Sequence, residues 1–292
     1  MRRAAALLAL LLLGFPTPAQ EAAPAAAPAA APAAASPDAR AAWERLCAAS
    51  GVAGREPLTA FHLRAEVRNR SGVQSNDADI DYRYLAPDCI RFALPSKNET
   101  GRFGPAQEQY WVKEGKKVTV LSGREWKESR QSVDDMLALA RNYAALANPA
   151  RLTLLALELV PVPTDLWTGL AREAGKLTWL ALESPDFALV RGEPGAARPE
   201  VYRVELGLRD DLPVIAIVRA KDKPGVDPLL VEFSRYEERD GYRIPMVLLV
   251  HVLDRKEMPV RFAATASQEV YVTAAALRPG FTVEDFKPEK SP

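Results

Sequence analysis

The feature that most constrains the fold of this chain is a pair of long, regularly alternating segments joined at a tight turn. From Leu230 to Tyr236, and again from Tyr242 to Val252, apolar residues recur at every second position, the period of a β-strand with one buried face. Asp240-Gly241 lies between the two segments and favours a two-residue turn, because glycine readily adopts a positive φ. The sequence therefore predicts a long antiparallel hairpin within a larger sheet.

Alternating apolar positions also occur in shorter segments on both sides of this hairpin. Ser71-Gly72 and Glu114-Gly115 mark two further tight turns. The expected strands cover residues 61–67, 78–84, 90–94, 109–121 as a hairpin, 177–182, 187–191, 201–209, 214–221, 260–264 and 269–274. Because strands follow strands directly, the pattern disfavours parallel α/β folds and favours an antiparallel sheet of the α+β class.

Helical periodicity is confined to the beginning and the middle of the chain. A short amphipathic helix is expected at residues 39–50. Ser132 and Asp135 form a capping box for a second helix, and further helical segments are expected at residues 149–159 and 165–174. A sheet with this many strands twists and curls. We therefore expect a large curved antiparallel sheet, an unclosed half-barrel whose concave face is covered by helices.

The segment before residue 39 is not expected to belong to the folded domain. Arg2 and Arg3 precede an apolar run and the small-residue site Thr17-Pro-Ala19, which is the order of a cleaved secretory signal over residues 1–19. The apolar run is shorter than the roughly 20 residues of a membrane-spanning helix, so an uncleaved anchor is the alternative that we disfavour. We expect residues 20–38, rich in alanine and proline, to be a linker or a solubilising tail. Residues 39–292 then form one exported, periplasmic domain without a transmembrane helix.

The charge balance and the short motifs exclude several classes of function. The chain has 38 basic and 38 acidic side chains and a pI near 6.8, so it lacks the basic surface expected for binding nucleic acid. His62 and His251 are its two histidines, and they do not form an H-x-x-x-H pair that would hold zinc. G-x-S-x-G, C-x-x-C and glycine-rich phosphate-loop motifs are absent from the sequence. We therefore expect no cofactor, no metal site and no enzymatic activity.

Three aspartates at alternate positions, Asp77, Asp79 and Asp81, resemble part of a calcium-binding loop. Such a loop requires a glycine where this chain has Tyr82 and a glutamate where it has Asp88. We interpret the aspartates instead as a solvated strand face that opposes edge-to-edge pairing.

Cys47 and Cys89 are the two cysteines, and in an exported chain they are sufficient for one disulfide. One interpretation is that the disulfide joins the first helix to a strand. The alternative is that both cysteines are buried thiols.

Aromatic residues are frequent on the apolar faces of the expected strands, where they usually fill a core. They are Phe61, Tyr82, Tyr84, Phe92, Tyr110, Tyr202 and Phe233. A large half-closed barrel is difficult to fill with side chains alone, so the alternative is that some of them line a cavity between sheet and helices.

Several segments, taken in order, resemble the LolA-like family of periplasmic lipoprotein carriers. They are the signal sequence, the strand Phe61–Val67, the segment YLAPDCIRF at 84–92, the hairpin YWVKEGKKVTVL at 110–121, and DGYRIP at 240–245, which is similar to the family's D-G-x-x-x-P turn. The resemblance covers most of residues 58–286. It implies an unclosed antiparallel barrel with a helical lid that binds acyl chains or other lipid groups on its concave apolar face.

We therefore expect an exported, non-enzymatic protein that holds lipid acyl chains or lipoprotein lipid groups in an apolar cavity, in transport to the outer membrane. Its partner would be a lipid or an acylated lipoprotein, and a helix at residues 132–147 would be the lid. The residues expected to bind the ligand are Phe61, Leu63, Val67, Tyr82, Tyr84, Phe92, Met136, Tyr143, Tyr202 and Phe233. The alternative is a structural or interaction module of the cell envelope with a fully packed core, which presents its edge or its linker to an envelope protein.

Overall fold

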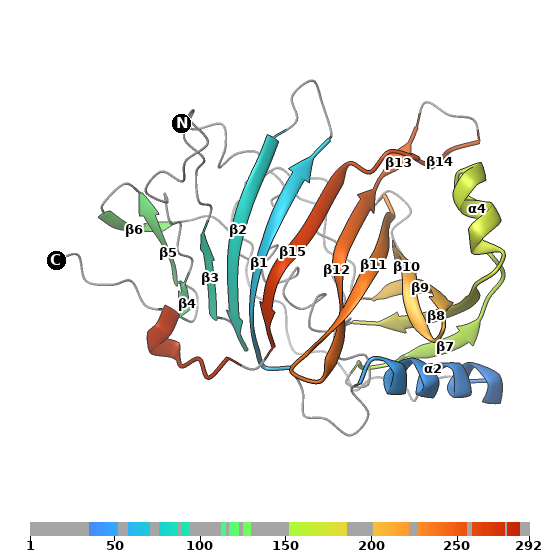
Figure 1. Cartoon of the computed structure of the whole chain (residues 1–292), viewed down its shortest axis with the longest axis horizontal. Helices are drawn as coiled ribbons and strands as arrows, with labels where there is room; N and C mark the ends of the chain where they lie inside the picture. The colour runs from blue at the N-terminus through green and yellow to red at the C-terminus, as the bar shows by residue number, and fades with distance from the viewer. Residues whose placement is uncertain are drawn as a thin grey trace.

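The main feature of the computed structural model is one large antiparallel sheet (Figure 1). The model describes residues 35–51, 58–70, 76–86, 89–93, 112–114, 117–122, 125–129, 152–185, 201–221, 227–255, 259–277 and 279–286. Within these residues the sheet has thirteen strands, in the spatial order β6 (Glu125–Ser129), β5 (Lys117–Ser122), β4 (Val112–Glu114), β3 (Cys89–Ala93), β2 (Asn76–Leu85), β1 (Ala60–Asn69), β15 (Gln268–Ala276), β12 (Tyr242–His251), β11 (Leu229–Arg239), β10 (Leu212–Ala220), β9 (Tyr202–Arg209), β8 (Thr178–Ser184) and β7 (Ala156–Leu159).

Each strand pairs antiparallel with its neighbours, as the alternating sequence pattern predicted. The first strand, β1, pairs with the last, β15, so the two halves of the chain join in the middle of the sheet. The order runs linearly from β6 to β7, which leaves the sheet unclosed. A separate two-stranded hairpin, β13 (Leu253–Asp254) and β14 (Arg261–Phe262), lies where a single strand at residues 260–264 was expected.

The hairpin predicted around Asp240-Gly241 is confirmed. Asp240 and Gly241 have φ values of 51° and 78°, and a positive φ at both central residues matches the right-handed twist of the flanking strands. Asp210 and Asp211, with φ values of 52° and 60°, form the equivalent turn between β9 and β10. An aspartate accepts this conformation more readily than most side chains, so the Asp210-Asp211 pair was a turn signal in the sequence.

Local irregularities bend the strands. The pairing register shifts between Arg64 and Ala65 in β1, and again between Pro213 and Ile215 in β10. In β11, Arg235 adopts a left-handed φ of 54° and leaves the regular ladder, although the pairs on either side of it keep their register. Bulges and kinks of this kind increase twist and curvature, so they help the sheet to curl rather than extend flat.

The first helix, α2 (Pro37–Ala49), packs against the end of the sheet that carries β7, β8 and β10. It begins at Pro37 rather than at Ala39, because the Ser36 side chain caps it by accepting a hydrogen bond from the Ala39 N–H at 3.2 Å. Its other end is tied to the hairpin turn, where the Arg243 N–H donates to the Ser50 carbonyl at 3.1 Å. Together these contacts hold α2 across the strand ends (Figure 1).

The prediction of a helix at residues 149–159 is wrong. Ala156–Leu159 is the edge strand β7, which pairs with β8 and places Leu157 in the core. Leucines at positions 152, 155 and 159 fit a helical period, but pairing with a neighbouring strand overrides so weak a local preference. The helix expected at residues 165–174 is present as α4 (Thr168–Ala174). The expected helix at 132–147 and the expected strand at 187–191 lie outside the described residues.

The strands β8, β10 and β11 carry buried residues on both faces because each face has its own apolar cluster. The inner cluster, on the side of α2, includes Leu180 and Val204. The outer cluster includes Trp179 and Ile217, which alternate with inner residues along the same strands, and it is covered by α4 and by β14. Of the two described helices, α2 therefore covers the inner face as expected, whereas α4 packs against the outer face.

Candidate functional site

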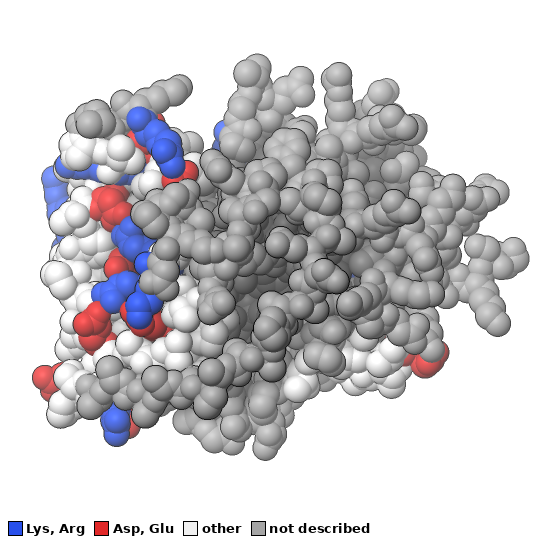
Figure 2. Space-filling view, turned by 180° about the vertical axis from the view of Figure 1, so that it is seen from behind, with Lys and Arg blue, Asp and Glu red and all other residues white. Residues whose placement is uncertain are grey.

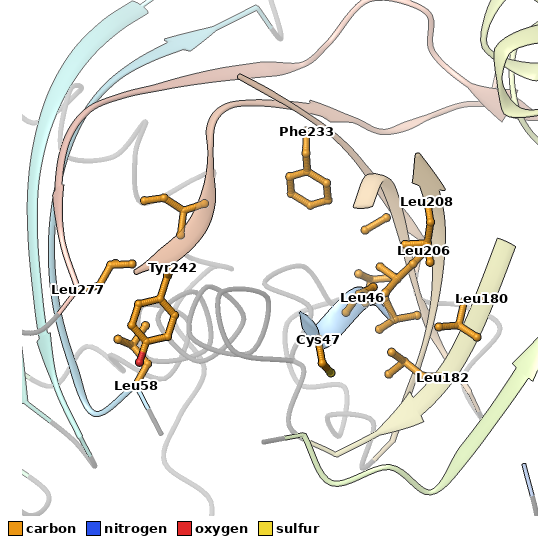
Figure 3. Close-up of a cluster of buried hydrophobic side chains, with 14 of the residues drawn as sticks. Leu46, Cys47, Leu58, Leu180, Leu182, Leu206, Leu208, Phe233, Tyr242 and Leu277 are labelled. Carbon is orange, nitrogen blue, oxygen red and sulfur yellow. The ribbon is translucent and has the colours of Figure 1, made fainter. Parts of the chain in front are cut away.

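The inner face of the sheet is an extensive apolar surface. Figure 3 shows buried side chains of this cluster directed from different parts of the curved sheet toward a common interior, with Leu206 and Leu208 on one side and Tyr242 and Leu277 on another. Strand alternation explains its composition, because every second residue of β1, β2, β8, β9 and β12 faces inward and most of these residues are apolar or aromatic.

One end of this face is closed by α2 and by the turn between β11 and β12. Leu46 and Cys47 of α2 are buried in the inner cluster with Leu180 and Leu182 of β8 (Figure 3). On the outside of the helix, the Arg45 guanidinium pairs with Asp211 at 3.0 Å, which ties α2 to the turn between β9 and β10. Helix α2 is therefore held at the closed end by apolar packing on its inner side and by its ion pair with a turn on its outer side.

A straight row of apolar residues crosses the middle of the inner face. In the register of the sheet Val67 lies opposite Val270, Val270 opposite Leu248, and Leu248 opposite Phe233. Val67 and Phe233 are buried, with exposed fractions of 3% and 4%, but Val270 and Leu248 between them are only partly buried. By contrast, Leu180 and Val204 near α2 are completely buried. The centre of the inner face is thus more accessible than its closed end.

Three further inward residues share this intermediate accessibility although they belong to central strands. They are Leu63 of β1, Ile80 of β2 and Val231 of β11. We refer to Leu63, Ile80, Val231, Leu248 and Val270 as the central apolar patch. In a fully packed core such inward positions would be buried, so this patch is the part of the inner face at which an apolar molecule could add contacts.

Aromatic rings form the wall of the inner face on β1 and β2. Phe61 stacks on Tyr82 with ring centroids 5.7 Å apart and lies 5.2 Å from Tyr84. Burial, followed by the neighbouring Tyr84, raises the pKa of Tyr82 well above its ordinary value, so this phenol stays neutral. These rings present an uncharged surface.

Charged side chains are directed to the outer face, where they pair with one another. Asp81 accepts hydrogen bonds from His62 at 3.0 Å and Arg64 at 3.1 Å, and it pairs with Arg83 at 3.3 Å. Burial alone would raise the pKa of Asp81, but the bond from His62 and the charges of His62 and Arg83 outweigh burial and lower it to about 2. The aspartate face is therefore solvated as expected, and Asp81 is in addition ion-paired. It does not guard an edge, however, because β2 lies between β1 and β3.

A second ion-pair network covers the outer face of the opposite flank. Arg203 bonds to Glu158 at 2.7 Å and Glu205 at 3.3 Å, and Arg219 pairs with Glu205 and Asp165. Figure 2 shows basic and acidic side chains mixed on this flank of the molecule, which carries β7 to β10. Neither sign of charge dominates there, which agrees with the balanced composition.

The structure places the residues expected to bind a ligand as follows. Phe61, Val67, Tyr82, Tyr84, Tyr202 and Phe233 all lie in the inner cluster and are at most 5% exposed, whereas Leu63 is partly buried beside them. Phe92 belongs to β3 and pairs with Tyr82, but its side chain is not described. Met136 and Tyr143 lie outside the described residues. The expected aromatic residues are therefore wall residues, already in contact with other protein groups.

The sequence interpretation missed Ile80, Val231, Leu248 and Val270. All four follow the same two-residue period as the predicted residues, so their direction could be read from the sequence. The accessibility of these four side chains could not be read from the sequence, because it depends on how far α2 and the neighbouring side chains reach across the sheet.

The described residues contain no cluster of three or more histidine, cysteine, aspartate or glutamate side chains that could hold a metal ion. No described helix is both long and apolar enough to cross a membrane. Neither cysteine is in a disulfide. Cys47 lies in the inner cluster and Cys89 packs beside Phe286, so the disulfide interpretation is wrong and the alternative of two buried thiols holds.

Comparison with known proteins finds no matching family model and no matching curated relative. Several solved structures are similar. A LolA superfamily protein from Nitrosomonas europaea is 12% identical, with 86% of this chain and 97% of that chain covered and a TM-score of 0.49. A putative outer membrane lipoprotein-sorting protein domain from Vibrio parahaemolyticus is 10% identical, with 84% and 97% covered and a TM-score of 0.42. A DUF1329 family protein from Desulfovibrio piger is 14% identical, with 85% and 97% covered and a TM-score of 0.43. These are similarities of structure at low sequence identity, and no individual residue is carried over from them.

Proposed function

We propose that this protein is an exported, non-enzymatic carrier that holds the acyl chains of a lipid or of an acylated lipoprotein against its inner apolar face. The observation that carries the proposal is the central apolar patch, whose five residues face inward on central strands and are nevertheless only partly buried. The secretory signal expected at residues 1–19 and the resemblance of the sequence to periplasmic lipoprotein carriers support a periplasmic location and a role in transport to the outer membrane.

The physical basis of binding is burial of hydrocarbon. Each buried CH₂ group contributes about 0.8 kcal/mol, so even part of an acyl chain provides useful affinity without a charged clamp. Val270 and Leu248 are adjacent across β15 and β12, so a chain laid along this row would contact both of them, and Val231 is the next inward residue after Phe233 on β11. Because such contacts are non-directional, the carrier would accept chains that differ in length.

The first test is to extract purified protein with organic solvent and to identify the extracted lipids by mass spectrometry. The stripped protein is then titrated with N-phenyl-1-naphthylamine, a neutral probe that fluoresces in apolar surroundings. The proposal predicts co-purified acyl lipid and saturable probe binding that added lipid reverses. A lipid-free extract together with no saturable probe binding would refute it, and would favour an envelope module with a fully packed core.

A matched pair of variants locates the binding surface. Leu248→Trp enlarges an inward side chain in the middle of the central apolar patch, whereas Leu249→Trp makes the same change at the next residue of β12, which faces outward between Glu232 and Glu269. We expect the first variant to lose most of its probe binding while it remains folded, because the bulky ring occupies space that a ligand would use. We expect the second to bind like the wild type. Equal binding by the two variants would place the probe elsewhere.

A further inference from the structure

The inner face carries no ionisable aspartate, glutamate, lysine, arginine or histidine at the inward positions of the described strands β1, β2, β3, β8, β9, β10, β12 and β15. These positions hold Phe61, Leu63, Ala65, Val67, Ile80, Tyr82, Tyr84, Ile90, Leu180, Leu182, Ser184, Tyr202, Val204, Leu206, Leu208, Ala216, Val218, Tyr242, Ile244, Met246, Leu248, Val270 and Val272. The charged residues of the same strands occupy the alternate, outward positions. The inner face is therefore uncharged at these positions, as a buried sheet face usually is.

In the strand β11, charged side chains follow the inward residues along the chain. Val231 and Phe233 face inward, but from Arg235 onward the strand leaves the alternation. Beyond Arg235, Glu237 pairs with Arg239 at 2.5 Å and both side chains are exposed, 38% and 44% respectively. Arg235 is itself exposed and is the cation closest in sequence to the inward residues of β11.

An ionised group that enters an apolar surface without a partner carries a large desolvation penalty. A free fatty acid has such a group, a carboxylate, directly on its acyl chain. An ester-linked or amide-linked chain has none. From the uncharged inner face we infer that this protein selects acyl chains attached through neutral ester or amide linkages and discriminates against free fatty acid anions.

This inference rests on the proposed function, but it makes a separate prediction about ligand class. Displacement of N-phenyl-1-naphthylamine from the stripped wild-type protein is measured with methyl decanoate and with decanoate at pH 7.5. We expect the ester to displace the probe at a concentration at least about tenfold lower than the anion. Displacement of equal strength by the two ligands would overturn the inference and leave the carrier function intact. Failure of both ligands to displace a bound probe would refute the carrier function itself.

The pH dependence of the same experiment requires no variant. A carboxyl group that resembles a glutamate side chain has an ordinary pKa of about 4.3, so decanoic acid becomes largely neutral when the pH falls from 7.5 to 4. We expect its displacement curve to approach that of the ester over this range, while the ester curve stays unchanged. A preference for the ester that persists at pH 4 would contradict discrimination by charge.

Three variants test the residues involved. Arg235→Gln removes the exposed cation of β11 that is nearest in sequence to its inward residues, and it is expected to leave the ratio of ester to anion unchanged. A larger ratio would identify Arg235 as a carboxylate partner and overturn the inference. Leu248→Arg introduces a cation on the inner face and is expected to improve displacement by decanoate relative to the ester. Leu249→Arg is the matched control on the outer face of the same strand, and we expect it to leave the wild-type ratio in place.

Discussion

Replacement of Gly51 by alanine tests how firmly α2 closes one end of the inner face. Gly51 follows the helix at a φ of 74°, in the left-handed region where a side chain is strained. A Cβ added there would lie 2.5 Å from the backbone oxygen of Gly241, a distance that real Cβ atoms do not adopt. Gly241 cannot easily retreat, because it belongs to the two-residue turn and the adjacent Asp240 carboxylate accepts a hydrogen bond from the Leu277 N–H at 2.7 Å.

Two terms raise the cost of this substitution in free energy of unfolding, and a third lowers it. Left-handed alanine costs about 1–2 kcal/mol, and relief of the backbone overlap costs on the order of 1–3 kcal/mol. Reduced freedom of the unfolded chain returns about 0.4–1 kcal/mol. We therefore expect Gly51→Ala to lower the free energy of unfolding by about 1–5 kcal/mol, measured by urea denaturation followed by circular dichroism.

Gly280→Ala is the matched control, because no atom lies within 4 Å of the position that its Cβ would take and its φ is not in the left-handed region. We expect a change within about 0.5 kcal/mol for this variant. If Gly51→Ala were as stable as Gly280→Ala, the close contact between the end of α2 and the hairpin turn would be refuted.

Three further predictions concern charge and thiol reactivity. The pKa of Asp81 is lowered to about 2, so its ion pairs stabilise the fold above the unfolded pKa of about 3.9 and are lost as the pH falls through about 2. Asp81→Asn should therefore lower the free energy of unfolding by about 2 kcal/mol at pH 7. This difference should shrink below pH 4, as measured by urea denaturation at each pH. Burial, and then the neighbouring Glu44, raises the pKa of Cys47 to about 11, and Cys89 is buried as well. Native protein at pH 8 should therefore resist iodoacetamide at both cysteines, whereas denatured protein should gain two labels, as measured by mass spectrometry. Two labels on native protein would contradict the described packing. Phe286→Ala should open Cys89, but not Cys47, to labelling, because Phe286 packs against Cys89 and lies in a different cluster from Cys47. Labelling of both thiols would indicate general unfolding instead.

The sequence predicted the strands well because their signal is local. The spacing of Tyr242, Ile244 and Met246 at every second position indicates which side of β12 faces the inner cluster, and Asp240-Gly241 determines where the strand begins. The edge strand β7 was mistaken for a helix because its leucines fit both periods and only its partner β8 decides between them. Short apolar segments of this kind depend on tertiary context.

The candidate site was predicted in direction but not in detail. Aromatic residues such as Phe61 and Tyr82 were expected to contact a ligand, yet their size lets them pack against each other and become wall residues. The smaller Val270 and Leu248 remain partly accessible because shorter side chains fill less of a wide curved face. The position of α4 on the outer face could also not be predicted from the sequence pattern, because a short apolar helix can cover either face of a sheet that is apolar on both faces.

The most direct test of the account is to locate a bound chain on the protein by nuclear magnetic resonance. Protein labelled at the methyl groups of leucine and valine is mixed with a neutral spin-labelled fatty acid methyl ester, and the paramagnetic broadening of each methyl signal is measured. The account predicts strong broadening at Leu63, Val231, Leu248 and Val270, and little at Val260 and Val283, which are exposed away from the inner face. Broadening at Val260 and Val283 with sharp signals from the central apolar patch would contradict it.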